Sequence, residues 1–122
     1  MGNRILLVDD EPQLVYLVAS RLKASGYEVL TAGDGQTALE MAKKERPDLV
    51  VLDLMLPRMD GFKVCGLLKK DSRYASIPII LFSAKAQESD REMGMEAGAD
   101  AYITKPFDPE LLLGKIQELT IS

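Results

Sequence analysis

Residues 5–11 read Ile-Leu-Leu-Val-Asp-Asp-Glu, and residues 49–53 read Leu-Val-Val-Leu-Asp. In each stretch, four apolar residues run without interruption into acidic ones. An apolar run of this length, bounded by turn-forming residues, is typical of a β-strand that is buried on both faces. Such strands belong to parallel sheets, where ligands bind at the carboxyl ends of the strands. The two stretches therefore predict a parallel sheet that carries carboxylates at its ligand-binding edge.

The rest of the chain alternates short apolar runs with helical patterns. We predict strands over residues 5–8, 28–31, 49–53, 77–82 and 101–103. Helical spacing of apolar residues begins at Pro12 and stops at Gly26, and it returns over residues 37–45, 61–70, 88–97 and 109–119. This strict alternation predicts an α/β fold of the doubly wound, flavodoxin-like class. Its five-stranded parallel sheet has the order 2-1-3-4-5 and carries helices on both faces.

The composition is that of an ordinary globular domain. The chain has 122 residues, 47% of them hydrophobic and 28% charged, and a net charge of −4. We predict a single domain over residues 1–122. The acidic balance and the lack of a basic stripe argue against direct nucleic-acid binding. We find neither a signal-peptide pattern nor an apolar stretch of about 20 residues, so we expect a cytoplasmic protein without a membrane span.

Two residue types narrow the chemistry further. The sequence contains no histidine and a single cysteine, Cys65. The absence of histidine excludes Ser-His-Asp and Cys-His catalysis and imidazole zinc sites. A lone cysteine cannot form an intramolecular disulfide, and Cys65 lies in a helical pattern. We interpret it as a small buried hydrophobic residue rather than a reactive thiol.

Polar residues follow four of the predicted strands. In the 2-1-3-4-5 order the chain reverses between strands 1 and 3, so Asp9, Asp10 and Asp53 are expected to lie close together. Strand 4 ends at Ser83-Ala84, and strand 5 runs into Thr104-Lys105-Pro106. A hydroxyl and an ammonium therefore join the carboxylates at the same edge. The candidate site consists of Asp9, Asp10, Asp53, Ser83 and Lys105.

The clustered carboxylates predict a divalent cation. Like charges repel and raise one another's pKa unless a cation intervenes. Zinc and copper prefer histidine or cysteine ligands, whereas Mg²⁺ takes one or two carboxylates together with waters and phosphate oxygens. We expect Mg²⁺, or Mn²⁺ in its place, held by Asp10, Asp53, Asp9 through water, and the backbone carbonyl of Met55. The simpler alternative is that Asp9 and Asp10 only stabilise the N-terminus of the following helix.

Five motifs occur in a fixed order and spacing: residues 5–11, 53–61, 82–84, 98–100 and 102–107. On these motifs the whole chain resembles the receiver domains of response regulators in two-component signalling. The resemblance implies that Asp53 is the phosphoacceptor and that Asp9 and Asp10 are the acidic pair that organises Mg²⁺. It implies that Lys105 pairs with the phosphoryl group and with the acceptor carboxylate.

The resemblance also implies a switch. Ser83 and the backbone of Ala84 would bind the phosphoryl group once it arrives, and Tyr102 would swing inward as Ser83 moves. The Lys105–Pro106 bond is expected to be cis, as only X-Pro bonds commonly are. Met55 and Lys85 flank the site without a carboxylate or amide that could orient an attacking water. We therefore expect a long-lived phosphoryl group.

The implied function is that of a phosphorylation-activated receiver in a phosphorelay. The donor would be a phosphohistidine on a sensor histidine kinase or a phosphotransfer protein, because this chain has no histidine. Phosphorylation would reshape the surface formed by the fourth helix, fifth strand and fifth helix. That surface would control a protein partner or an output domain. The chain would catalyse only its own phosphorylation and dephosphorylation.

Two alternatives belong to other functional classes. A hydrolase with an aspartyl-phosphate intermediate would usually carry a second acid two residues after the nucleophile, where this chain has Met55. A flavin-binding module of the same fold would need a glycine- and hydroxyl-rich phosphate loop after the first strand. Asp9, Asp10 and Glu11 would repel that phosphate. Phosphate release from small phosphomonoesters would support the hydrolase, and a bound chromophore would support the flavin-binding module.

Overall fold

The computed structural model describes residues 3–84 and 87–120. Within these ranges, strands and helices alternate along the whole chain, as the sequence predicts. The elements are β1 (Arg4–Val8), α1 (Pro12–Ala24), β2 (Glu28–Ala32), α2 (Gly35–Glu45), β3 (Leu49–Asp53), α3 (Gly61–Lys70), β4 (Ile79–Ser83), α4 (Glu88–Glu96), β5 (Ala101–Thr104) and α5 (Pro109–Thr120).

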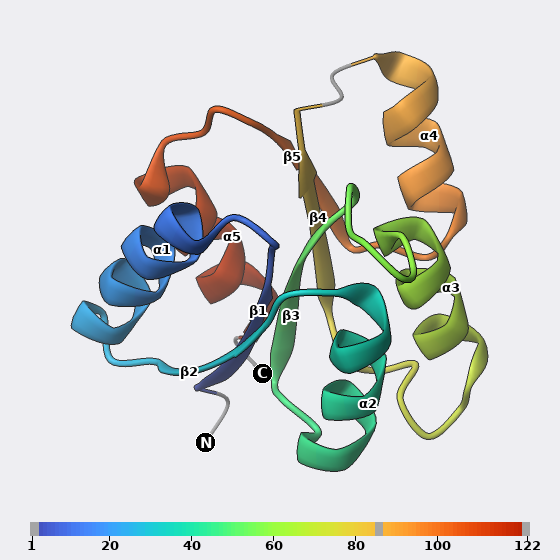
Figure 1. Ribbon diagram of the computed structural model, residues 1–122, viewed down its shortest axis with the longest axis horizontal. Helices are drawn as coiled ribbons and strands as arrows, with labels where there is room; N and C mark the ends of the chain where they lie inside the picture. The colour runs from blue at the N-terminus through green and yellow to red at the C-terminus, as the bar shows by residue number, and fades with distance from the viewer. Residues whose placement is uncertain (1–2, 85–86, 121–122) are drawn as a thin grey trace.

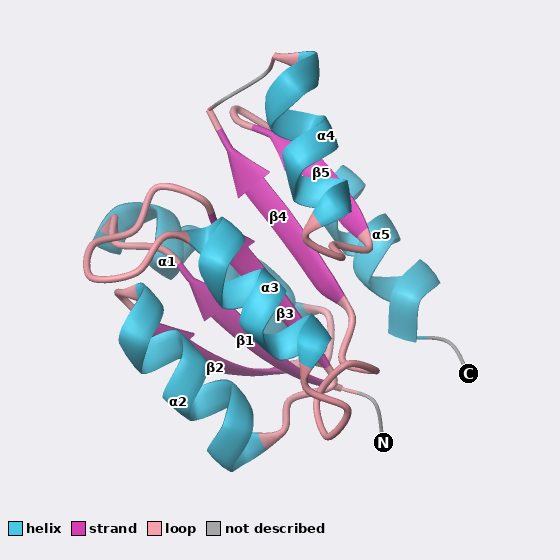
Figure 2. Ribbon diagram, turned by 90° about the vertical axis from the view of Figure 1, so that its right-hand side faces the viewer, coloured by secondary structure: helices cyan, strands magenta, loops and turns pink. Residues whose placement is uncertain are grey.

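The five strands form one sheet in the order β2-β1-β3-β4-β5, and all neighbouring pairs are parallel. The predicted α/β fold and strand order are therefore confirmed. Figure 1 shows α1 and α5 on one face of the sheet and α2, α3 and α4 on the other. Figure 2 looks onto the second face, with β1 and β3 in the middle of the sheet. The reversal of the chain lies between these two strands.

The alternation of side chains along each strand divides the core in two. Leu6 and Leu52 belong to the cluster beneath α2, α3 and α4, whereas Ile5, Val51 and Phe82 belong to the cluster beneath α1 and α5. Every residue of β3 and β4 is buried. This burial on both faces is the reason that these strands read as uninterrupted apolar runs.

Local signals explain where helices begin and end. The Asp34 side chain accepts a hydrogen bond from the backbone N–H of Thr37, so α2 begins at Gly35, two residues before the predicted start. Asp60 caps α3 in the same way, through the N–H of Lys63. Strand β4 begins at Ile79, directly after Pro78, rather than at Ile77.

Cys65 is fully buried, and burial raises the pKa of its thiol to about 11. Its prediction as an unreactive core residue agrees with this environment, because the thiolate is the reactive form. Across residues 3–84 and 87–120, none of the helices combines the length and the apolar character that crossing a bilayer requires.

Candidate functional site

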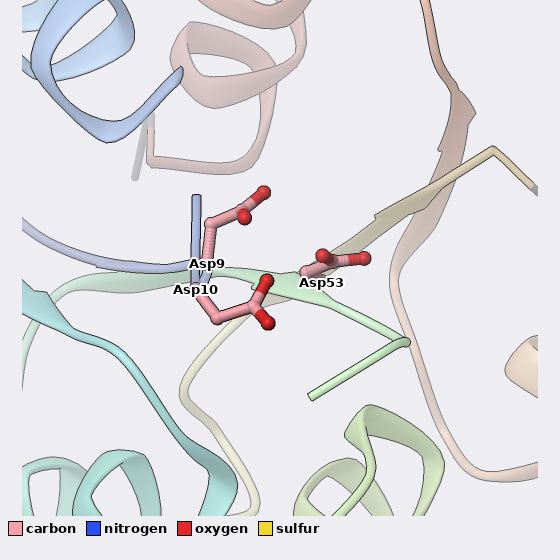
Figure 3. Close-up of side chains that lie close together, drawn as sticks. All are labelled: Asp9, Asp10 and Asp53. Atoms are coloured by element: carbon pink, nitrogen blue, oxygen red, sulfur yellow. The ribbon is translucent and has the colours of Figure 1, made fainter. Parts of the chain in front are cut away.

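Three carboxylates meet at the carboxyl ends of β1 and β3. Asp9 and Asp10 follow β1, and Asp53 is the last residue of β3. These strands are neighbours in the sheet, with Val8 in register with Leu52. One carboxylate oxygen from each aspartate lies within 4.8 Å of the others. Figure 3 shows the three side chains side by side, and the sequence prediction of an acidic cluster is confirmed.

The cluster is unusual in its burial. Asp9 is 2% and Asp53 is 4% exposed, whereas Asp10 is exposed. Buried carboxylates are rare unless they are paired or hydrogen-bonded. Asp9 Oδ1 accepts a hydrogen bond from the N–H of Glu11, and Asp53 Oδ1 accepts one from the N–H of Met55. The backbone immediately after each strand therefore satisfies one oxygen of each buried acid.

Lys105 supplies the counter-charge from the loop after β5. Its ammonium donates to Asp9 Oδ2 at 2.8 Å and to Asp53 Oδ2 at 3.3 Å. The Lys105 backbone is held as well, because its N–H donates to the carbonyl of Ser83 at 2.7 Å. The peptide bond between Lys105 and Pro106 is cis. One cation thus bridges acids that are 44 residues apart in sequence.

Sequence reasoning did not identify the residue that lies beneath this ammonium. The Lys105 ammonium lies 4.7 Å from the centre of the Phe82 ring, and Phe107 packs against that ring edge to face at 5.7 Å. A cation over an aromatic face is stabilised by the ring quadrupole. The phenylalanine before Ser83 and the one after Pro106 were the available signals.

Gly61 was also overlooked, although it follows the helix cap Asp60. A Cβ at this position would lie 2.4 Å from the carbonyl oxygen of Asp53. No side chain fits at that distance, so only glycine lets the start of α3 approach the backbone of Asp53. The close approach fixes the loop that carries Met55.

The charges in the site are unbalanced. Burial, together with the charge of Asp9, raises the pKa of the Asp53 carboxyl, although Lys105 and the Met55 N–H act in the opposite direction. Burial alone would lower the pKa of Lys105, but the hydrogen bond and charge of Asp9 and Asp53 outweigh it, so that pKa is raised. Lys105 therefore stays charged, and a group of three carboxylates has a single ammonium, which contacts two of them.

This donor set fits a hard divalent cation. Its side-chain ligands are carboxylate oxygens, and no histidine exists in the chain. Oxygen ligands of this kind suit Mg²⁺, Mn²⁺ or Ca²⁺ rather than zinc or copper. The site is open on the side of Asp10, which is exposed, as is Met55 at 59%. The site is therefore accessible from solvent.

The remaining predicted residues line the β4–β5 side of the site. Ser83 is fully buried at the end of β4, and Ala84 is exposed just beyond it. Tyr102 lies in β5 and is 7% exposed. Burial and then the charge of Asp90 raise the pKa of its phenol, against the effect of a side-chain hydrogen bond with Ser83. Lys85 lies outside the described residues.

Comparisons with known proteins agree with this geometry. Residues 5–117 match the family described as the response regulator receiver domain. The chain is 44% identical over 119 residues to the alkaline phosphatase synthesis transcriptional regulatory protein PhoP of Bacillus subtilis, covering 98% of this chain and 49% of that protein. It is 46% identical over 120 residues to the response regulator PleD of Caulobacter vibrioides, covering 98% and 26%. The chain thus spans about half the length of PhoP and a quarter of that of PleD.

Solved structures give the same result. The BeF3-activated N-terminal receiver domain of Klebsiella pneumoniae RstA superposes with a TM-score of 0.91 at 32% identity, covering 98% of this chain and 100% of that one. A response regulator structure from Chloroflexus aurantiacus gives a TM-score of 0.92 at 31% identity, covering 97% of both chains. The fold, the acidic edge of the sheet and these matches lead to one conclusion: the chain belongs to the family of response regulator receiver domains.

Proposed function

We propose that Asp53 accepts a phosphoryl group in a reaction that depends on Mg²⁺. The observation that carries this proposal is the arrangement around Lys105, whose ammonium contacts Asp9 and Asp53 while Asp10 completes a group of three acids. Phosphoryl transfer requires positioning and charge neutralisation more than covalent assistance. A buried nucleophile between a lysine and a cation-binding pair meets both needs.

The residues of this chain have distinct parts in the reaction. Asp53 attacks the phosphorus in line, a P–O bond forms, and the P–N bond to the donor imidazole breaks with its electron pair returning to that imidazole. Lys105 would neutralise the negative charge of the phosphoryl group on Asp53, because its ammonium already contacts one oxygen of that carboxylate. The Met55 N–H donates to the other oxygen and so orients the carboxylate.

The cation site would be formed by Asp9, Asp10, Asp53 and the backbone carbonyl of Met55. When bound there, Mg²⁺ supplies positive charge that offsets the repulsion between the carboxylates and the incoming phosphoryl oxygens. The three carboxylate oxygens within 4.8 Å support this assignment. Mn²⁺ has the same preference for oxygen ligands and can substitute.

Ser83 and Tyr102 form the proposed switch. The phosphoryl group adds negative charge and strong acceptor oxygens beside the end of β4. The Ser83 hydroxyl and the backbone N–H of Ala84 would bind it. The inward orientation of Tyr102, which is 7% exposed here, would then be favoured over an outward one. The surface of α4, β5 and α5 would then change shape, so that a partner can distinguish the phosphorylated from the unphosphorylated protein.

The donor must be another chain, because this one contains no histidine. We propose a sensor histidine kinase or a phosphotransfer protein that carries a phosphohistidine. The target is either a separate protein or an output domain. The relatives PhoP and PleD, described as a transcriptional regulatory protein and a response regulator, extend well beyond the length matched here.

Intact-mass spectrometry tests the proposal. The protein is incubated with acetyl phosphate with and without Mg²⁺, alongside Asp53→Asn and the control Asp108→Asn. Asp108 is an exposed aspartate at the start of α5, away from the acidic cluster. We expect one phosphoryl group on the unmodified protein and on Asp108→Asn, only with Mg²⁺, and none on Asp53→Asn. A phosphoryl group that persists on Asp53→Asn would overturn the assignment of the acceptor.

A further inference from the structure

The side chain of Tyr102 packs against α4. We call its contact with Gly94 and Arg91 the seat of Tyr102. In Figure 2, α4 lies alongside β5, the strand that carries this residue. A Cβ on Gly94 would lie 3.0 Å from Tyr102 Cδ2 and 3.0 Å from Leu81 Cδ1. The ring therefore packs against the helix at the one point of α4 that is buried, where glycine provides no side chain. This contact explains the burial of Tyr102.

Arg91 of α4 also contacts Tyr102. It precedes Gly94 by three residues, so both lie on the same face of α4. The Arg91 guanidinium carbon lies 5.2 Å from the centre of the Tyr102 ring, and Nη1 donates to the backbone carbonyl of Tyr102 at 3.2 Å. One side chain thus holds both the ring and the backbone of the same residue.

These contacts connect α4 to Ser83. The side chains of Tyr102 and Ser83 share a hydrogen bond, and Ser83 ends the strand next to Asp53. A ring that leaves the seat would lose the guanidinium stacking and its packing on Gly94 together. The contact of Arg91 therefore opposes any outward rotation of Tyr102. Arg91 itself lies on α4, whereas the three carboxylates of the site come from the ends of β1 and β3.

We infer that Arg91 is a positioning residue that holds Tyr102 in its buried orientation and thereby sets the balance of the Ser83–Tyr102 switch. The part of this inference that concerns the switch rests on the proposed function. The part that concerns the seat does not, because it requires no phosphoryl group.

Nitration of tyrosine by tetranitromethane, read by peptide mass spectrometry, tests the seat. The molecule contains two internal references, since Tyr16 is 71% exposed and Tyr74 is 6% exposed. In Arg91→Ala we expect nitration of Tyr102 to become about three- to tenfold faster, as loss of a cation–π contact predicts. Tyr16 and Tyr74 should keep their rates. Loss of the Arg91 charge would by itself raise the pKa of the phenol and slow the reaction, so faster nitration reports exposure.

Arg73→Ala is the matched control. Arg73 stacks on Tyr74 with its guanidinium carbon at 5.2 Å from the ring, the same distance as in the Arg91–Tyr102 pair. This variant should leave the nitration rate of Tyr102 unchanged. An unchanged rate for Tyr102 in Arg91→Ala would overturn the inference. If Tyr74 also becomes reactive in Arg91→Ala, the fold of that variant has loosened, and Arg91→Lys is used instead. Faster nitration of Tyr102 alone in Arg91→Lys supports the inference, and an unchanged rate overturns it.

Acetyl phosphate with Mg²⁺ then tests the switch. In Arg91→Ala we expect phosphorylation to slow the nitration of Tyr102 back toward the rate of the unmodified protein, because the phosphoryl group draws Ser83 and Tyr102 inward. A fully phosphorylated variant whose Tyr102 stays reactive would overturn the link to the switch. If no phosphoryl group is incorporated, the proposed function is refuted. The nitration rates without acetyl phosphate would still show whether Arg91 holds Tyr102 in its buried orientation.

Discussion

Two half-buried lysines, Lys69 and Lys105, lie at opposite edges of the same sheet, and their surroundings differ. Lys69 of α3 pairs with Asp100 at 2.9 Å and donates to the carbonyls of Ala75 and Ile77 at 3.1 and 2.8 Å. Asp100 in turn accepts a hydrogen bond from the N–H of Ile79. One positive and one negative charge meet here, and every partner is satisfied. This network joins α3 to the loops that precede β4 and β5.

Lys105, at the carboxyl edge, has the opposite surroundings. Its ammonium contacts the two buried carboxylates of a group of three, and the pKa of Asp53 is raised as a result of burial and of its neighbour Asp9. A balanced ion pair at one edge therefore stabilises the fold, whereas an excess of negative charge at the other creates a need for a cation. In this protein the two lysines are therefore distinguished by the balance of charge around them rather than by their burial.

The largest expected effect is on the structural pair. Lys69→Met leaves Asp100 and two carbonyls without their cation, so we expect the free energy of unfolding to fall by about 3 kcal/mol, near the lower end for breaking a buried pair because Asp100 is partly exposed. Urea unfolding measures it. The loss should be the same in Mg²⁺ and in EDTA. If Mg²⁺ restored the stability of Lys69→Met, the Lys69 edge of the sheet would also respond to the cation, and the contrast with the Lys105 edge would be wrong.

Lys105→Met should behave differently. The raised pKa of Lys105 means that its charge favours folding at all pH values below that pKa, so at pH 7 the contribution is fully present. In EDTA we expect the free energy of unfolding to fall by about 1–3 kcal/mol. Mg²⁺ should reduce this loss, because it neutralises the same carboxylates. A loss independent of Mg²⁺ would show that Lys105 is only structural.

Mg²⁺ itself should stabilise the unmodified protein. At ten times its dissociation constant, a ligand that binds only the folded state raises the free energy of unfolding by about 1.4 kcal/mol. Asp10→Asn should lose this increment at little cost to the fold, since Asp10 is exposed. Asp108→Asn should retain it. Urea titrations with MgCl₂ measure the increment, and equal stabilisation of Asp10→Asn would contradict the assigned ligand set.

The smallest effect concerns pH. A carboxyl whose pKa is raised on folding favours the folded state when protonated, and this contribution is lost as the pH rises through the folded pKa. Metal-free Asp53→Asn should therefore be more stable than the unmodified protein at pH 7, because burial and Asp9 disfavour the charged carboxyl. The difference should shrink as the pH falls to about 4. If the stability difference between the two proteins grew on acidification, the pKa of Asp53 would be lowered on folding rather than raised.

The predictable part of this protein follows from local patterns. Apolar runs such as residues 49–53 and helical spacing identified the strands and helices of the described residues, and no predicted end differs from the observed one by more than two residues. The aspartate cluster was also predictable, because the carboxyl ends of parallel strands share one edge. Residues that act through packing were not. Phe82 and Arg91 contact their partners, Lys105 and Tyr102, across elements that are separate in sequence.

Local patterns were enough to predict which residue types lie at the sheet edge, because those residues directly follow apolar runs. The strand order followed from the fold class that strict alternation of strands and helices predicts. The balance of charges, in contrast, depends on the packing of segments that are distant in sequence, which sets the partners of each lysine. This packing also sets the surroundings of Tyr102. It pairs Lys69 with one acid and places Lys105 between two. It also places Tyr102 against Gly94 and Arg91. The physical reason is that distance and burial set the strength of electrostatic and aromatic contacts, and both arise only when distant segments pack together.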